Sequence, residues 1–157
     1  MNNPIERVKN YLDTLEEDLK VIEFDEGSTK TAQMAADQLG VTVGQIAKSI
    51  LFLAKEEPIL VVTSGDRKVH TSSLKRVIGA KPRMAKPDEC IEITGFSPGG
   101  LCPFALKQPL RVLIDQSMDR FDQVYAAAGT ANSAVPVTTE KLLDITGGEL
   151  VQVCRDA

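Results

Sequence analysis

The chain of 157 residues, 43% hydrophobic and 25% charged with a net charge of −4, has the composition of an ordinary soluble globular protein. It contains no apolar run near the roughly 18 residues that span a membrane, and it begins without the layout of a signal peptide, so we expect a cytoplasmic protein without membrane contact. Three widely spaced cysteines and one histidine argue against a disulfide framework and against structural zinc, and we expect neither a metal nor a cofactor.

Apolar residues between Ile5 and Leu19 recur at spacings of three and four, which predicts an amphipathic N-terminal helix within residues 1–20, packed on the rest of the chain. Capping residues, Gly and Pro mark the ends of the other helices, and runs of aliphatic residues predict the strands. In chain order, we expect a strand at 20–24, a helix at 32–39, a helical turn at 44–47, strands at 49–53 and 59–63, a helix at 72–78 capped by Thr71 or Ser72, a helix at 87–94, strands at 110–114, 124–128 and 134–137, a helix at 139–146 and a strand at 150–154.

These short elements do not alternate with the helical crossovers of about 10–15 residues that a doubly wound parallel sheet requires. We therefore expect a mixed α/β (α+β) fold that forms a single domain over residues 1–157. Its sheet should be twisted and largely antiparallel, or a partly open barrel, with short helices around it.

Positive charge is concentrated in residues 66–86, which hold seven Lys and Arg against one acidic residue, a net charge of +6, whereas the remainder carries −10. A basic segment on an acidic body indicates a docking face for a polyanion, although a solvated helix and turn would have the same composition. The candidate docking residues are Lys68, Lys75, Arg76, Lys81 and Arg83.

The loop from Gly95 to Gly100, with the sequence Gly-Phe-Ser-Pro-Gly-Gly, is the first candidate for chemistry. Gly99 and Gly100 lack a Cβ, so a ligand can approach the backbone closely, and successive N–H groups suit a carbonyl oxygen, an oxyanion or a phosphate. Pro-Gly-Gly is also an ordinary turn signal. Lys48, at the mouth of an apolar strand, suits the same negative groups, or it is a surface lysine.

The sequence gives little support for other known arrangements of catalytic residues. A Ser-His-Asp triad would need His70, which lies among basic residues and suits a surface position. A nucleophilic Cys102 beside the glycine loop would lack a histidine partner. The paired carboxylates lie in contexts typical of solvated faces, and neither a Walker loop nor a dinucleotide fingerprint occurs.

The order of Ile46-Ala47-Lys48-Ser49-Ile50, the stretch 74–81, Met84-Ala85 and the loop 95–100 resembles the YbaK/EbsC family, from about Phe24 to the C-terminus. Members of this family are related to the editing insertion of bacterial prolyl-tRNA synthetase. The resemblance implies the hydrolysis, in trans, of the ester that joins a wrong amino acid to its tRNA, most simply a tRNA(Pro). It also implies two partners, the acceptor end of the mischarged tRNA and an aminoacyl-tRNA synthetase, and leaves the oligomeric state open.

The same resemblance assigns roles to residues of the site. Lys48 matches the essential lysine of the family, and Gly99 and Gly100 match its substrate-facing loop, so these three are the catalytic candidates. The candidate substrate-binding residues are Phe24, Ser49, Gly95, Pro98, Gly129, Thr130 and Asn132.

Ala127 and Ala134 lie in the run 126–134, where many cysteine-clearing members carry a serine and an acidic residue. This difference leaves the edited amino acid open. It also supports an alternative function, a non-catalytic binding module of the same fold that holds a tRNA end, a nucleotide or a partner protein.

Overall fold

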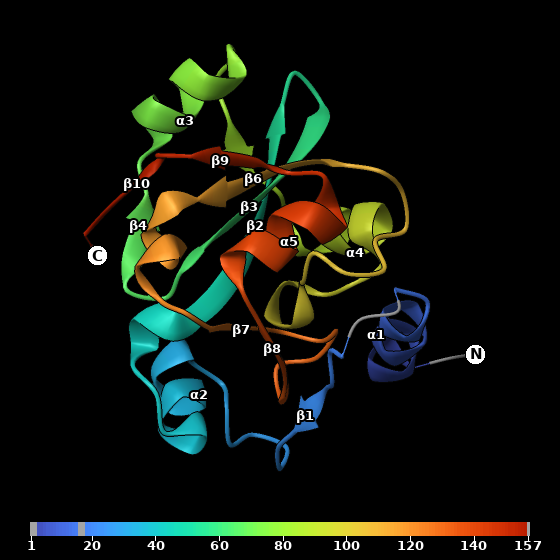
Figure 1. Ribbon diagram of the computed structural model, residues 1–157. Helices are drawn as coiled ribbons and strands as arrows, with labels where there is room; N and C mark the ends of the chain where they lie inside the picture. The colour runs from blue at the N-terminus through green and yellow to red at the C-terminus, as the bar shows by residue number, and fades with distance from the viewer. Residues whose placement is uncertain (1–2, 16–17, 157) are drawn as a thin grey trace.

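The computed structural model describes residues 3–15 and 18–156 (Figure 1). A mixed sheet forms its body, and a two-stranded ribbon lies beside it. In spatial order the sheet contains β1 (Ile22–Glu23), β8 (Ser133–Val137), β7 (Val124–Ala126), β2 (Ile46–Ala54), β3 (Glu57–Ser64), β6 (Arg111–Asp115) and β9 (Glu149–Val151), and β5 (Arg83–Met84) also pairs with β2. The ribbon pairs β4 (Arg67–Val69) with β10 (Cys154–Asp156).

Five helices and three 3₁₀ turns are described around the sheet (Figure 1). They are α1 (Pro4–Asp13), α2 (Ala32–Leu39), α3 (Thr71–Ile78), α4 (Pro87–Thr94), α5 (Thr139–Thr146), η1 (Val43–Gln45), η2 (Pro98–Gly100) and η3 (Gln116–Arg120). Side-chain caps begin α2 and α5, because Thr31 accepts a hydrogen bond from Met34 N at 3.1 Å and Thr138 accepts one from Lys141 N at 3.0 Å.

The expected mixed fold with a mostly antiparallel sheet is confirmed. Among the described residues, five strand pairings are antiparallel and three are parallel. The parallel pairs join β2 to β7 and place β6 between β3 and β9. The sequence carries no signal for them, since the connection from β3 to β6 runs through several short elements and not through one crossover helix.

The two ends of the chain differ from the expected elements. The N-terminal helix ends at Asp13 and does not reach residue 20, yet Leu15 and Leu19 pack against the core, so their spacing reflects burial alone. The expected strand at 150–154 is divided into β9 and β10. It divides because the backbone N–H of Val153 donates to the Asp115 carboxylate, at 2.8 Å, and not to a neighbouring strand.

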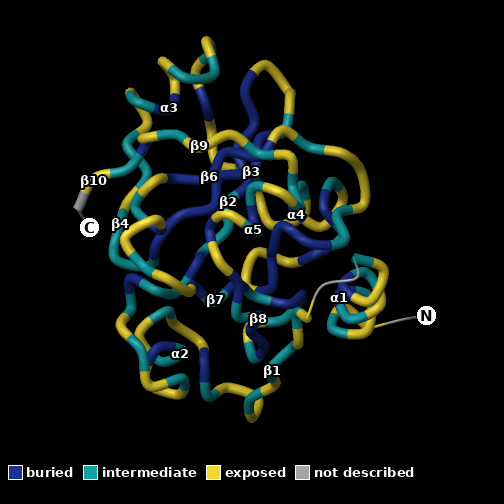
Figure 2. The backbone as a smooth tube through the Cα atoms, viewed as in Figure 1, coloured by how far each residue is buried: buried dark blue, intermediate teal, exposed yellow. Residues whose placement is uncertain are grey.

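Alternation along β2 separates two hydrophobic clusters, and Figure 2 shows buried backbone concentrated in the central strands. Ala47 and Leu51 belong to the larger cluster, which α1, α5 and the loop after η2 also enter. Phe52 belongs to the smaller cluster, which Leu74 of α3 completes. Each fully buried aliphatic or aromatic side chain contributes roughly 1.5–3 kcal/mol to folding, so β2 is held from both faces.

Helix α1 fixes the glycine-rich loop. The guanidinium of Arg7 donates to Thr94 O at 3.1 Å and to Ala105 O, and it lies 4.5 Å from the ring centroid of Phe96. Val8 and Leu12, on the inner face of the same helix, are buried in the larger cluster. Both ends of the loop are therefore tied to α1. Among the described residues, no helix combines the length and the apolar character that a bilayer crossing needs.

Asp115 is 2% exposed, and its carboxylate accepts hydrogen bonds from Ser117 N at 3.0 Å and Val153 N at 2.8 Å. We expect Asp115→Ala to lower the free energy of unfolding by about 3 kcal/mol, because two N–H groups lose a charged acceptor. Asp115→Asn should lose less, since one acceptor oxygen remains. Urea denaturation measures the change, with the exposed Asp119→Ala as control, for which about 0.5 kcal/mol or less is expected. Equal stabilities of Asp115→Ala and the parent protein would contradict this role.

Candidate active site

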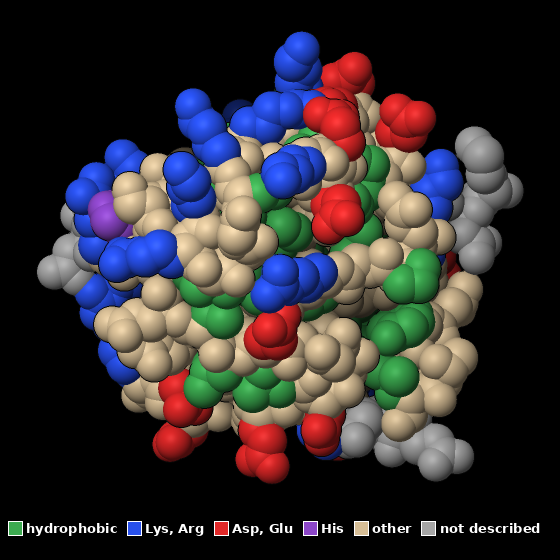
Figure 3. Space-filling model, turned by 90° about the horizontal axis from the view of Figure 1, so that it is seen from above, with side chains coloured by type: hydrophobic (Ala, Val, Ile, Leu, Met, Phe, Trp, Pro, Cys, Tyr) green, Lys and Arg blue, Asp and Glu red, His purple; other side chains and the backbone are tan. Residues whose placement is uncertain are grey.

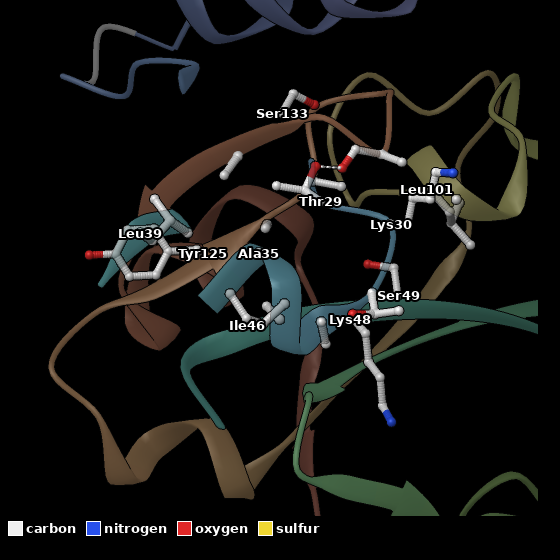
Figure 4. A pocket seen from close by; sticks show the side chains of 18 of the residues that line it. Thr29, Lys30, Ala35, Leu39, Ile46, Lys48, Ser49, Leu101, Tyr125 and Ser133 are labelled. Carbon is white, nitrogen blue, oxygen red and sulfur yellow. Dashed lines mark hydrogen bonds between the residues drawn. The ribbon is translucent and has the colours of Figure 1, made fainter. Parts of the chain in front are cut away.

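A cavity of about 170 Å³ opens where β2, β7 and η2 meet α2 and the loop before it (Figure 4). Its wall is made mostly of small side chains, with larger apolar ones from Leu39, Ile46, Leu101 and Tyr125. The lining comprises residues 29–32, 35, 39, 46–49, 98–99, 101, 125–127, 131 and 133–134. Of the predicted site residues, the fold brings Lys48, Ser49, Pro98 and Gly99 together here.

The cavity exists because the sheet is incomplete at this place. The edge of β2 that faces away from β3 pairs with β7 at Ile46–Ala47 and with β5 at Phe52–Leu53. Strand β7 ends at Ala126, and the chain then turns away through Gly129. In the described structure, a short length of β2 edge is left facing the η2 loop.

Gly100 packs against the neighbouring backbone and does not line the cavity. A Cβ on Gly100 would overlap the carbonyl group of Gly129, which belongs to the backbone, whereas a Cβ on Gly99 would lie 3.8 Å from Cβ of Ala131. Gly99 lines the cavity, and Gly100 is buried. The close approach of two backbones at Gly100 thus sets the width of the cavity between η2 and the loop at 129–131.

Lys48 lies inside β2, as its third residue, and not at the junction of turn and strand that the sequence suggested. Its Nζ points away from the cavity and donates to Arg67 O on β4 at 2.5 Å (Figure 4). Across the ladder Lys48 faces Thr63, whose hydroxyl contacts Cys154 Sγ at 3.1 Å. The ammonium group is therefore on the side of the sheet where the ribbon of β4 and β10 lies.

Five hydroxyl-bearing side chains line the cavity, and they differ in their hydrogen bonds. Thr31 accepts from Met34 N at 3.1 Å, and Tyr125 donates to Gln123 Oε1 at 3.2 Å. Thr29 donates to Ala131 O at 2.6 Å, and Ser133 accepts from Ala128 N at 3.0 Å and donates to Thr130 O at 2.9 Å. Ser49 Oγ is buried, and no described residue offers it a hydrogen-bond partner. Because a buried hydroxyl without a partner is costly, Ser49 is the group most suited to meet a ligand.

The other predicted substrate-binding residues lie outside this cavity and support the chain around it. Gly95 ends α4 with a φ of +85°, and Gly129, with a φ of +97°, lies where a Cβ would be 2.8 Å from Pro4 O. Phe24 and Asn132 bind each other, through Asn132 Nδ2 donating to Phe24 O at 3.0 Å and Phe24 N donating to Asn132 O at 2.8 Å. Thr130 and Asn132 border a neighbouring hollow of about 430 Å³.

Sequence reasoning missed the part of the cavity wall that comes from α2, the loop before it and β7. Thr29, Ala35, Leu39 and Tyr125 line the cavity, but their neighbours in sequence carry no motif. Tyr125 reaches it through the parallel register that places it opposite Ile46. Such long-range parallel pairing leaves only an apolar run in the sequence, which does not identify the partner strand.

The five candidate docking residues are all exposed, but one of them already has acidic partners. Arg83 is paired with Glu89 at 2.9 Å and with Glu56 at 3.6 Å. The hydrogen bond from Arg83 lowers the pKa of Glu89 to about 2, and the same contact raises the pKa of Arg83. The positive charge of Arg83 is thus balanced within the protein.

Lys68 on β4 faces Arg155 on β10, and α3, which begins after His70, carries Lys75 and Arg76. Figure 3 shows Lys and Arg side chains gathered around His70. We refer to Lys68, Lys75, Arg76 and Arg155 as the basic face. It lies on the side of the sheet toward which the Lys48 ammonium points.

The nucleophile hypothesis for Cys102 is wrong. Its thiol is fully buried, and burial raises its pKa to about 12, so the reactive thiolate is not populated near neutral pH. Within the described part of the chain, no three His, Cys, Asp or Glu side chains cluster closely enough to hold a metal ion.

The glycine contacts give a test of the loop. We expect Gly100→Ala to destabilise the protein by about 1–3 kcal/mol or more, because its methyl group would overlap the backbone of Gly129. Gly99→Ala is the matched control and should leave the unfolding midpoint nearly unchanged, since its Cβ meets only an ordinary contact. Thermal and urea unfolding of both variants measure the difference, and equal effects would show that the two backbones can separate without cost.

Comparison with known proteins identifies the family of this chain. Residues 26–145 match the family described as the aminoacyl-tRNA editing domain. The chain is 38% identical over 138 residues to the uncharacterized protein YwhH of Bacillus subtilis strain 168, with 87% of each protein covered. It is 30% identical over 124 residues to the multifunctional Ser/Thr-tRNA deacylase ProXp-y of Escherichia coli K12, covering 75% of this chain and 74% of that protein.

The fold comparison leads to the same family. A crystal structure of a candidate trans-editing enzyme for prolyl tRNA synthetase superposes with a TM-score of 0.93 at 33% identity, over 99% of each chain. The resemblance expected from Lys48 and the glycine-rich loop is therefore confirmed, and the chain belongs to the family of aminoacyl-tRNA editing domains.

Proposed function

We propose that this protein hydrolyses, in trans, the ester of a mischarged aminoacyl-tRNA, with tRNA(Pro) as the first candidate and the cytoplasm as its place of action. The observation that supports this function most is the cavity between the Pro98-Gly99 turn and the incomplete edge of β2. Residues 1–157 would act as one editing unit, because α1, which precedes the matched stretch 26–145, packs into the larger core and holds the glycine-rich loop.

The size of the cavity favours a small amino acid. Alanines at 32, 35, 47, 126, 127, 131 and 134 line it, and its volume is about 170 Å³. The large apolar side chains at this wall are those of Leu39, Ile46, Leu101 and Tyr125. A side chain the size of that of alanine, serine or threonine suits such a space, and the similarity to a Ser/Thr-tRNA deacylase supports the same class.

Hydrolysis needs no strong nucleophile from the protein, because an aminoacyl ester is already activated. Water attacks the ester carbonyl, the bond between the carbonyl carbon and the ribose oxygen breaks, and the ribose oxygen leaves as a hydroxyl with a proton from the water. Donors that hold the carbonyl oxygen stabilise the negative charge that develops on it during the attack. The cavity offers backbone and hydroxyl groups for this purpose, from η2 and from Ser49. We infer a different place for Lys48: its ammonium, on the side of the basic face, suits a phosphate near the tRNA terminus and not the scissile carbonyl.

A binding module without turnover is the second candidate. Ala127 and Ala134, which replace the serine and acid expected from the family resemblance, both line the cavity. A protein that only holds a tRNA end would keep the cavity and the basic face but lack hydrolysis.

Deacylation of a panel of substrates tests the proposal. Purified protein is incubated at sub-stoichiometric amounts with tRNA(Pro) carrying alanine, cysteine or proline, and with tRNAs mischarged with serine or threonine. We expect multiple-turnover hydrolysis of an ester with a small side chain. Activity should fall by about 100-fold in Lys48→Ala, because the substrate is then no longer positioned through its phosphate.

Lys107→Ala, at an exposed position outside the cavity lining, is the matched control and should keep full activity. Circular dichroism establishes that both variants are folded. If the folded protein hydrolyses none of the esters in the panel, the deacylase function is rejected and the binding module is favoured.

The basic face gives a second prediction. We expect the double variant Lys75→Glu, Arg76→Glu to bind tRNA(Pro) at least tenfold more weakly than the parent protein. The slope of log K against log salt concentration should also become shallower, by about 1 for each phosphate that the variant no longer binds. Lys107→Glu reverses a charge away from this face, and its binding should stay close to that of the parent protein. Fluorescence anisotropy over a range of salt concentrations measures both quantities, and parallel slopes for all three proteins would place the tRNA elsewhere.

A further inference from the structure

The open edge of β2 has a defined centre. Strand β7 pairs with β2 at Ile46–Ala47 and β5 pairs with it at Phe52–Leu53, so among the described strands none pairs with this edge at Ser49. Ser49 lines the cavity. An unpaired strand edge next to a cavity can accept a further segment with main-chain donors and acceptors.

Alternation along β2 tells which way the main chain of Ser49 points. Ile46 O accepts from Gly65 N, at 2.7 Å, on the side of β3, whereas Leu51 O accepts from Ala85 N, at 2.9 Å, on the opposite side. Successive residues of a strand direct their N–H and C=O groups to opposite edges, so odd-numbered residues of β2 point to the open edge. The N–H and C=O of Ser49 therefore both face the gap.

Ser49 adds a third group. Its Oγ is buried, and no described residue supplies a partner. The other four cavity hydroxyls are already bonded within the protein; they belong to Thr29, Thr31, Tyr125 and Ser133. A donor, an acceptor and a hydroxyl thus converge on the cavity from a single residue of a rigid central strand.

We propose that this edge binds the aminoacyl group of the substrate as a one-residue antiparallel strand, an inference that rests on the proposed deacylase function. An aminoacyl group has the same N–Cα–C=O skeleton as a residue in a strand. In a hydrogen-bonded antiparallel pair, two facing residues exchange both of their main-chain bonds. Ser49 N–H then donates to the ester carbonyl oxygen, and the α-ammonium group of the substrate donates to Ser49 C=O.

This pairing also places the side chain of the substrate. Facing residues of an antiparallel pair carry their side chains on the same face of the sheet. The side chain of the bound amino acid therefore lies beside Ser49 Oγ, on the face that carries Ala47 and Leu51. A hydroxyl-bearing side chain satisfies Ser49 Oγ, whereas a methyl group leaves it without a partner. Ser49 is thus the residue that discriminates serine from alanine.

Binding of stable amide analogues tests the inference apart from hydrolysis. The probes are 3′-deoxyadenosines whose 3′-amino group carries L-seryl, L-alanyl or L-lactoyl, the last with a hydroxyl in place of the α-ammonium group. By isothermal titration calorimetry we expect about tenfold tighter binding of seryl than alanyl, and about tenfold tighter binding of alanyl than lactoyl.

Two variants separate the contacts. Ser49→Ala should remove the preference for seryl over alanyl and keep that for alanyl over lactoyl, with the exposed Ser72→Ala as matched control. Ser49→Pro removes the N–H on the open edge without removing a bond to β3, so the fold should persist, and all three probes should bind at least tenfold more weakly. Amide hydrogen exchange along β3 checks that its ladder is intact.

The outcomes are distinguishable from those of the deacylation panel. Equal affinities for alanyl and lactoyl, or no binding of any probe at millimolar concentration, would overturn the strand-like pairing even in an active deacylase. The expected order of affinities in a protein that hydrolyses none of the esters would support the pairing and reject the deacylase. A seryl preference that survives in Ser49→Ala would overturn the role of the hydroxyl.

Discussion

The pairing of β2 is the constraint on which the cavity, the core and the glycine-rich loop all rely. Along one edge β2 pairs with β3 over eight residues, from Ala47 to Ala54, and its two faces enter both hydrophobic clusters. Along the other edge it is paired only near its ends. Such a strand stays folded although a few main-chain groups in its middle are unpaired. The free energy lost at those groups is offset by the apolar side chains that β2 buries in the two clusters.

Two close contacts hold the η2 loop in place beside the cavity. Gly100 meets the backbone of Gly129, and Arg7 of α1 binds the carbonyl groups of Thr94 and Ala105 on either side of the loop. Neither contact touches the cavity, yet both set how far η2 stands from the open edge. Preorganisation of this kind matters for ester hydrolysis, where the protein contributes by placing donors and not by supplying a strong nucleophile.

The positive charges of the basic face and the cavity lie in different parts of this molecule. The cavity is lined mostly by small uncharged side chains, whereas Lys68, Lys75, Arg76 and Arg155 lie over α3 and the ribbon of β4 and β10. Lys48 connects the two, with its main chain at the cavity and its ammonium at Arg67 O. For a tRNA terminus, this division suits a small uncharged site for the amino acid and a cationic surface for the phosphates that follow it.

Local sequence was enough to predict the short helices, the caps of α2 and α5, the mixed fold class, the editing-domain resemblance, and the two segments that meet at the cavity. The cap of α3 is His70, which precedes the Thr71 or Ser72 that the sequence suggested. A cap such as Thr31 or a turn such as Pro98-Gly99-Gly100 depends on neighbouring residues alone. The parallel pairs, the direction of the Lys48 ammonium, the internal pairing of Arg83 and the open edge at Ser49 emerged only from the folded chain. Each of these depends on which distant segments become neighbours, and an apolar run such as that around Tyr125 records burial without naming the strand that lies beside it.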